Sequence, residues 1–142
     1  MDRIAVPLLL INLNDEGFHL LAEISVFGEK HFAVIDTGAS RSVFDSSFIL
    51  QYGAESSIPQ DTQQATTIFT TSATALAVIP KLKIGGLTIK DYPAIALDLA
   101  SVNEAYDLLG HPRIIGIIGS DIFYRYQARI NFKKLKLYFS KK

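Results

Sequence analysis

The 142-residue sequence contains no cysteine, no excess of charge of either sign and no long hydrophobic run. Without cysteine, neither a disulfide framework nor a thiolate metal site can form. The 14 basic and 14 acidic residues give a formal net charge of zero. Nucleic-acid binding needs a basic excess or stripe, so we expect no nucleic-acid partner.

The longest apolar stretch near the N-terminus is Ile4–Ile11, which is too short to span a bilayer. No small-residue cleavage site follows it, and the charges of Asp2 and Arg3 cancel, so the segment does not resemble a signal peptide. We therefore expect a strand of a cytoplasmic protein with no membrane partner.

Several common catalytic and binding motifs are also missing. The sequence has neither the Gly-x-Ser-x-Gly elbow of a serine hydrolase nor a G-x-G-x-x-G or P-loop pattern for phosphate. His19, His31 and His111 lie far apart and lack the spacing of metal ligands, so strand positions are the better interpretation. We expect neither a cofactor nor a bound metal.

Turn residues recur at short intervals, and the runs between them favour strands. Strands are predicted over Ile4–Asn12, Phe18–Phe27, Lys30–Ile35, Ser42–Phe44, Ala65–Phe69, Thr74–Ile84, Leu87–Leu97, Ile114–Ile118, Ala128–Phe132 and Leu135–Phe139. Short helices are predicted at 46–51, with Asp45 as the cap, and at 120–126. The pattern predicts a mostly β fold with two or three short helices in a single domain, residues 1–142.

The third helix has the clearest signals. Ser101 and Glu104 have the spacing of a capping box, and Gly110 with Pro112 marks the end of the helix. Its expected apolar stripe comprises Val102, Ala105, Leu108 and Leu109. Asp98 and Asp107 are interpreted, like Asp45, as caps or solvated residues.

Two segments carry the chemical information. In the first, the apolar strand Phe32–Ile35 runs directly into Asp36-Thr37-Gly38-Ala39. In the second, Ile117-Ile118-Gly119 precedes a short helix that begins at Ser120. An Asp-Thr-Gly triplet alone occurs by chance in roughly a few per cent of chains of this length, so the ordered pair is the informative feature.

Together these segments resemble the retropepsin-like aspartic proteases, in the bacterial single-domain form of the pepsin and retropepsin clan. Asp36-Thr37-Gly38-Ala39 matches the catalytic loop of the family, and Ile117-Ile118-Gly119 matches the element that packs beside it. The resemblance covers Phe18 to Phe139 and implies a closed acid-protease-type barrel.

The resemblance implies an aspartic endopeptidase that cleaves extended peptide or protein. Hydrolysis without a metal or covalent nucleophile needs one group to take a proton from water and another to give one to the carbonyl oxygen. Two facing carboxylates can do both, because they share one proton. The chain has one Asp-Thr-Gly, so the second Asp36 is expected from another copy across a two-fold axis in a homodimer.

The resemblance also implies residue roles. Asp36, Thr37 and Gly38 are expected to be catalytic, with Thr37 bonding across the two-fold axis and Gly38 keeping side chains away from substrate. The expected substrate contacts are Gly38, Ala39, Ser40, Thr71 and Ser72. Gly119 is expected to let its strand pass closely behind the loop, and Asp121 is interpreted as a structural carboxylate.

The sequence departs from the viral members in two places. They carry acidic residues on the loop and an arginine after the downstream glycine, where this chain has Ser40, Arg41 and Ser120. We therefore expect their ion pair to be missing, with a neutral bond between the serines in its place. The flap is the other departure, because residues 65–79 contain no glycine and the expected tip is 70–73.

The glycine-free flap motivates an alternative function, a catalytically inactive dimeric module that binds extended peptide. A further possibility is a monomer that pairs with a different chain.

Overall fold

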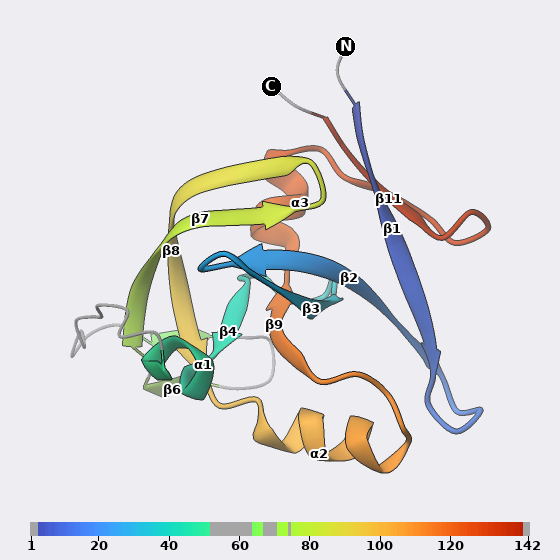
Figure 1. The fold of residues 1–142 in the computed structure, drawn as a ribbon, viewed down its shortest axis with the longest axis horizontal. Helices are drawn as coiled ribbons and strands as arrows, with labels where there is room; N and C mark the ends of the chain where they lie inside the picture. Colours follow the sequence, from blue (N-terminus) through green and yellow to red (C-terminus); the bar gives the residue numbers. More distant parts are fainter. Residues whose placement is uncertain (1–2, 52–63, 67–70, 74, 141–142) are drawn as a thin grey trace.

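The computed structural model describes residues 3–51, 64–66, 71–73 and 75–140. Six strands close a barrel in the order β2-β3-β9-β4-β8-β7, because β7 pairs back onto β2 (Figure 1). The strands are β1 Arg3–Asn12, β2 Phe18–Val26, β3 Glu29–Ile35, β4 Val43–Asp45, β5 Gln64–Thr66, β6 Thr71–Ala73, β7 Ala75–Ile84, β8 Leu87–Leu97, β9 Ile114–Ile118, β10 Arg129–Asn131 and β11 Lys136–Ser140. The helices are α1 Ser46–Gln51, α2 Ala100–Leu108 and α3 Ser120–Arg125. The predicted mostly β barrel with short helices is confirmed.

A three-stranded extension continues the sheet beyond the barrel. The second half of β1 pairs with β2, and its first half pairs antiparallel with β11, which places Arg3 opposite Ser140. Strands β1 and β11, from the beginning and the end of the described residues, therefore lie side by side, as Figure 1 shows. Strand β10 pairs with β11 and is the outer strand of this extension.

Strands β2 and β3 bury side chains on both faces. Leu20, Ala33 and Ile35 belong to the larger apolar cluster, whereas Leu21 and Val34 belong to a second cluster that includes helix α2. Successive side chains of a strand point to opposite faces, so this division follows from the alternation of the strands. Burial on both faces fixes the register of β3, the strand that leads directly into Asp36.

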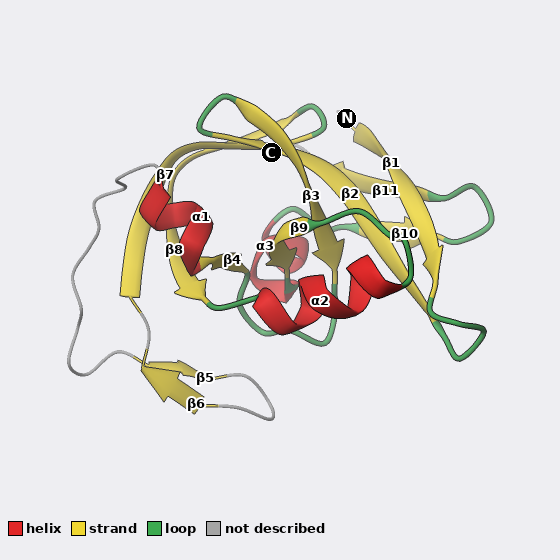
Figure 2. Cartoon of the chain, turned by 60° about the horizontal axis from the view of Figure 1, so that its bottom comes forward, coloured by secondary structure: helices red, strands yellow, loops and turns green. Residues whose placement is uncertain are grey.

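Helix α2 lies against the barrel, as Figure 2 shows. Its buried face differs from the predicted stripe. The helix and the residue before it bury Leu99, Asn103 and Tyr106, which are spaced by four and three residues.

Leu108, which the prediction placed on the buried stripe, is 87% exposed. Val102 packs against the second cluster as predicted, whereas Ala105 and Leu109 are also exposed. The stripe was therefore wrong at three of its four positions, and it missed Asn103, which takes a core position through hydrogen bonds that a polarity pattern does not reveal.

The two ends of α2 differ in how well they were predicted. The capping box was wrong, because Ser101 lies inside the helix and Asp98 accepts from the backbone nitrogen of Ala100 at 2.9 Å. The end at Gly110 is confirmed. The backbone nitrogen of Gly110 donates to the carbonyl of Asp107, and that of His111 donates to the carbonyl of Tyr106. This Schellman arrangement needs the left-handed φ of +76° that glycine adopts without strain.

Asp45 directly precedes α1, at the position predicted for its cap. Its carboxylate accepts from the backbone nitrogen of Leu99 at 3.0 Å, so it ties β4 to the segment that leads into α2. The expected flap tip is wrong, because residues 71–73 form strand β6. This strand pairs with β5 in a separate two-stranded sheet, and residues 67–70 lie outside the described residues. Among the described residues, no helix is long and apolar enough to cross a membrane.

Candidate active site

Asp36 lies where β3 leaves the sheet. Strand β3 runs parallel to β9, with Ile35 opposite Ile118, and the backbone nitrogen of Asp36 extends this pairing by donating to the carbonyl of Ile118 at 3.0 Å. The loop then turns back on itself. The nitrogen of Gly38 donates to Oδ1 of Asp36 at 2.9 Å, and that of Ala39 donates to the Asp36 carbonyl at 3.1 Å. The carboxylate is thus exposed on a loop whose backbone holds it in place.

Gly119 allows the downstream segment to touch the back of this loop. The backbone nitrogen of Ser120 donates to the carbonyl of Ala39 at 2.7 Å. A Cβ on Gly119 would stand 2.6 Å from that carbonyl oxygen and 3.0 Å from the carbonyl oxygen of Arg41. Backbone atoms cannot give way as a flexible side chain can, so the predicted close passage at Gly119 is confirmed. At Gly38, a Cβ would stand 3.3 Å from Oδ1 of Asp36.

A hydrogen-bonded network of Ser42, Tyr92 and Asp121 holds the same loop against Gly119. Oγ of Ser42 accepts from the nitrogen of Gly119 at 2.8 Å and donates to Oδ1 of Asp121 at 2.8 Å. The backbone nitrogen of Ser42 and the hydroxyl of Tyr92 also donate to the Asp121 carboxylate. Burial, and then the bond to Asp121, raises the pKa of Tyr92 well above its usual range. Asp121 is therefore a structural carboxylate, as predicted.

An ion pair of another kind lies beside the loop. Nε of Arg41 on the loop lies 3.8 Å from Oδ2 of Asp121 on α3. This pair does not involve Ser40 or Ser120, and the expected neutral bond between these two serines stays a prediction. The Arg41 side chain is 47% exposed, so the pair contributes at most about 1 kcal/mol.

A pocket of about 470 Å³ opens beside Asp36. Asp36 and Thr37 line it together with the mostly apolar residues Phe18, His19, Leu20, Val34, Ile35, Val102, Tyr106, Ile117, Ile130 and Phe132. Val34 belongs to the apolar cluster that includes α2, so α2 covers this part of the pocket. Concave, mostly apolar pockets with a few polar groups are typical of ligand sites.

Tyr106 and His19 form a polar pair in the wall of this pocket. Nδ1 of His19 and the hydroxyl of Tyr106 are hydrogen-bonded at 2.5 Å, although the residues are 87 positions apart in the sequence. Burial, and then the negative charge of Asp36, raises the pKa of Tyr106 to about 12. The electrostatic effect of Asp36 on Tyr106 is consistent with their common position in this pocket.

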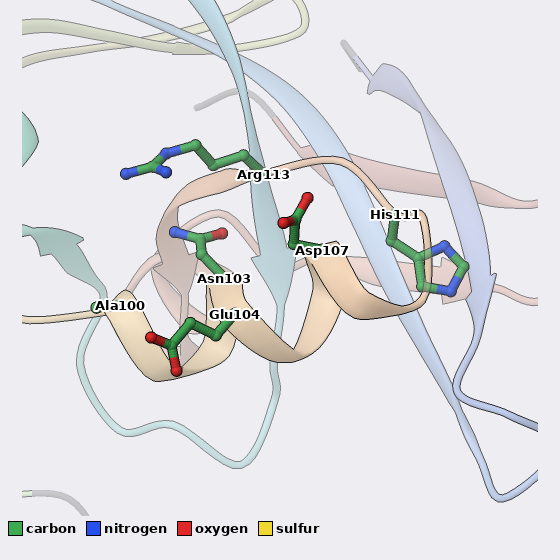
Figure 3. Close-up of a pocket in the computed structure, with 6 residues that line it drawn as sticks. All are labelled: Ala100, Asn103, Glu104, Asp107, His111 and Arg113. Atoms are coloured by element: carbon green, nitrogen blue, oxygen red, sulfur yellow. The ribbon is translucent and has the colours of Figure 1, made fainter.

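A second pocket, of about 380 Å³, lies along α2 and the loop that follows it (Figure 3). It is lined by Ala100, Asn103, Glu104, Asp107, His111 and Arg113. The side-chain amide of Asn103 accepts from the backbone nitrogen of Ile114 and donates to its carbonyl, which joins α2 to β9. The side chain of Asn103 therefore has a structural role in this pocket. In the described ranges, no three acidic or histidine side chains form a group that could hold a metal ion.

In the structure, only some of the predicted site residues lie close together. Asp36, Thr37, Gly38, Ala39 and Ser40 lie on one loop, but 71–72 lie in the separate β5–β6 sheet, opposite 65–66. Contact of Thr71 and Ser72 with substrate stays a prediction.

Sequence reasoning missed His19, Ser42, Tyr92 and Tyr106. Their partners are far away in the sequence, and the one local signal was the position of Tyr106 four residues after Val102 on a predicted helix.

Comparison with protein families identifies the class. The family model described as Aspartyl protease matches residues 22–122, which include the Asp36 loop and Gly119. The match spans more than half of the chain, and the chain therefore belongs to the aspartyl protease family. The comparison with curated proteins finds no match.

Solved structures define the fold more narrowly. A retropepsin-like aspartic protease from Rickettsia conorii matches with a TM-score of 0.61 and 18% identity, over 97% of this chain and 89% of that one. The retroviral protease-like domain of Ddi1 from Leishmania major matches with a TM-score of 0.50 and 15% identity, over 81% of this chain and 82% of that one. The chain has the retropepsin-like fold.

Proposed function

We propose that two copies of the chain form an aspartic endopeptidase in which the two Asp36 carboxylates meet at a two-fold axis and activate water. The observation that carries this proposal is the exposed Asp36 at the end of a buried strand, fixed by the nitrogen of Gly38 and open to a pocket. Membership of the aspartyl protease family supports it.

One chain supplies half of the required acid pair. The other acid near the loop, Asp121, accepts hydrogen bonds from Ser42 and Tyr92 and thereby holds the loop together. A carboxylate committed to these bonds is poorly placed to exchange a proton with water. The second catalytic carboxylate is therefore assigned to Asp36 of another copy.

The surface around Asp36 is suited to a second copy. Phe18 is 57% exposed and Phe132 is 64% exposed, and both line the pocket that contains Asp36 and Thr37. Strand β10, which ends one residue before Phe132, is the outer strand of its sheet and can pair with another strand. Exposed apolar side chains beside an open strand edge favour association.

The reaction follows from the shared proton. The ionised carboxylate takes a proton from water, whose oxygen then bonds to the carbonyl carbon of the peptide. The protonated carboxyl gives its proton to the carbonyl oxygen. In the second step the pair gives its proton to the nitrogen, the carbon–nitrogen bond breaks as the amine leaves, and a hydroxyl of the tetrahedral intermediate returns a proton to the pair. One water is consumed, and the pair again holds one proton.

Cleavage of an unfolded protein tests this function, measured from mildly acidic to neutral pH. The wild type is expected to cleave, and Asp36→Asn is expected to lose this activity because an amide cannot accept the proton. Asp98→Asn is the control, since Asp98 is an exposed acid that bonds locally to Ala100. Equal cleavage by Asp36→Asn and wild type would refute the assignment.

The sequence of the flap region favours one second candidate, a dimer that binds extended peptide without cleaving it. Residues 65–79 contain no glycine, and flap motion often limits turnover in enzymes of this kind. Peptide binding without hydrolysis at every pH tried would support the binding module. Robust hydrolysis would exclude the binding module.

A further inference from the structure

We propose that the outer face of strands β7, β2 and β3 is a docking site for an extended, acidic segment of another protein. These strands lie side by side in the wall of the barrel (Figure 1). Their outer face carries two depressions, of about 270 Å³ and about 240 Å³, which adjoin because Glu23 and Gly85 line both. Neither shares a lining residue with the pocket at Asp36, so the proposal goes beyond the peptidase function.

The larger depression contains a row of two lysines with a serine between them. Ser25 on β2 lies directly opposite Lys83 on β7 and directly opposite Lys30 on β3. The neighbours of Ser25 in the chain, Ile24 and Val26, are buried in the barrel core, so the row points to the outside of the barrel. Both lysines are exposed and line the depression, where they can bind one anionic group between them.

A second pair of lysines extends the positive charge along β7 and β8. Lys81 is two residues from Lys83, and therefore on the same side of β7, and it lies directly opposite Lys90 on β8. Like charges directly opposite each other destabilise a sheet. In the described part of the chain, the ion pairs involve none of the four lysines Lys30, Lys81, Lys83 and Lys90. Their charges are therefore available to a negatively charged partner.

Protection of a sheet edge does not explain these lysines. Lysine on an open edge strand commonly prevents pairing with another chain. Here β3 lies between β2 and β9, β7 lies between β2 and β8, and β8 lies between β4 and β7. The lysines thus stand on strands that are paired on both sides.

The smaller depression is mostly apolar. It is lined by Val6, Pro7, Leu8, Leu9, Leu21, Glu23, Phe32 and Gly85. Leu9 is 40% exposed, and Phe32 is half-buried on β3, two residues from Lys30 and on the same side of the strand. A ligand that fills both depressions therefore needs apolar groups followed by negative charges.

An extended polypeptide meets this requirement best. Its side chains on one face repeat at about 7 Å, which is also the spacing of the outward residues along β2, so successive side chains can enter both depressions. Glutamate and aspartate carboxylates form charge-assisted hydrogen bonds with lysine. A nucleic acid carries a phosphate at every step, and the apolar depression and Glu23 offer these phosphates no partner. The surface of a lipid bilayer cannot enter a depression.

Fluorescence anisotropy with the labelled peptide Leu-Leu-Gly-Glu-Glu-Glu, at low salt concentration, tests the docking site. Every protein in the test carries Asp36→Asn, so that the peptide stays intact and the result does not depend on the peptidase function. The test variant adds Lys30→Gln and Lys83→Gln to this parent protein. The matched control adds Lys133→Gln and Lys134→Gln, which replace two exposed lysines that line neither depression.

We expect the parent protein to bind the peptide and the test variant to bind it about tenfold more weakly, because two charge pairs worth up to about fivefold each are lost. The control variant is expected to keep the affinity of the parent. A peptide with glutamine in place of glutamate is expected to bind the parent about tenfold more weakly and to show no further loss in the test variant.

Absence of peptide binding, or equal affinities of the test and control variants, would overturn this inference and leave the peptidase function intact. A single-stranded oligonucleotide and phosphatidylserine vesicles are measured in parallel. If either of them requires Lys30 and Lys83 for binding and the peptide does not, the face binds another kind of anion and the inference is wrong.

Discussion

The close passage at Gly119 makes the substitution Gly119→Ala a direct test of how the Asp36 loop is held. Gly119 has φ of −116° and ψ of −170°, an extended conformation that alanine also adopts, so the effect of the substitution is steric. The new methyl group would stand 2.6 Å from the carbonyl oxygen of Ala39. Overpacking of this kind costs about 1–3 kcal/mol.

Relief of this clash also breaks hydrogen bonds. When the loop moves away, the bonds from Ser120 to Ala39 and from Gly119 to Ser42 are stretched, and each contributes about 1 kcal/mol. We therefore expect Gly119→Ala to lower the free energy of unfolding by about 2–4 kcal/mol, out of a total of roughly 5–15 kcal/mol. Peptidase activity is expected to fall as well, because Asp36 lies on the displaced loop.

Urea unfolding at one fixed protein concentration measures the effect, since a dimer's stability depends on concentration. With a slope of roughly 2 kcal/mol per molar urea, the middle of the usual range, the midpoint is expected to fall by about 1–2 M. Gly86→Ala is the matched control. Its Cβ would meet only a methyl group of Ile4 at an ordinary 3.4 Å, so no loss is expected. A Gly119→Ala midpoint within about 0.2 M of the wild type would refute the steric reasoning.

Two more predictions concern the groups around this loop. Asp121→Ala leaves the donors of Ser42 and Tyr92 without their carboxylate, and urea unfolding is expected to show a loss of about 2–4 kcal/mol; a loss below 1 kcal/mol would contradict the network. The folded state raises the pKa of Tyr106 to about 12 from an ordinary value near 10, so its stabilising contribution is complete below pH 10 and disappears as the pH rises to 12. Between pH 10 and pH 12, the free energy of unfolding is expected to fall by up to about 2 kcal/mol more in wild type than in Tyr106→Phe. An equal fall in both proteins would contradict the raised pKa of Tyr106.

The strands and the Asp36 loop were predictable because their signals are local. An apolar run that ends in Asp-Thr-Gly specifies a buried strand followed by an exposed acid, and β8 and β9 begin and end at the predicted residues. The close approach at Gly119 was predictable because the resemblance to the retropepsin-like family implies it. Gly110 was predictable because glycine is the common terminator of a helix.

The errors arise where a distant partner decides the role of a residue. The oxygen and the nitrogen of the Asn103 side-chain amide both bond to the backbone of Ile114, so Asn103 occupies a core position. The buried face of α2 therefore differs from the predicted stripe. Asp45 precedes α1 as predicted, but no local capping pattern reveals its bond to Leu99, 54 residues away. The bond between His19 and Tyr106 depends on the barrel bringing β2 and α2 together.

The central claim is that activity requires two Asp36 carboxylates from two copies, and mixing wild type with Asp36→Asn tests it most directly. If the copies exchange freely and pair at random, an equimolar mixture at constant total protein retains about one quarter of the wild-type activity, because only wild-type pairs are active. A mixture that retains one half, with activity proportional to the wild-type fraction at every ratio, would show that each chain works alone and would contradict the claim.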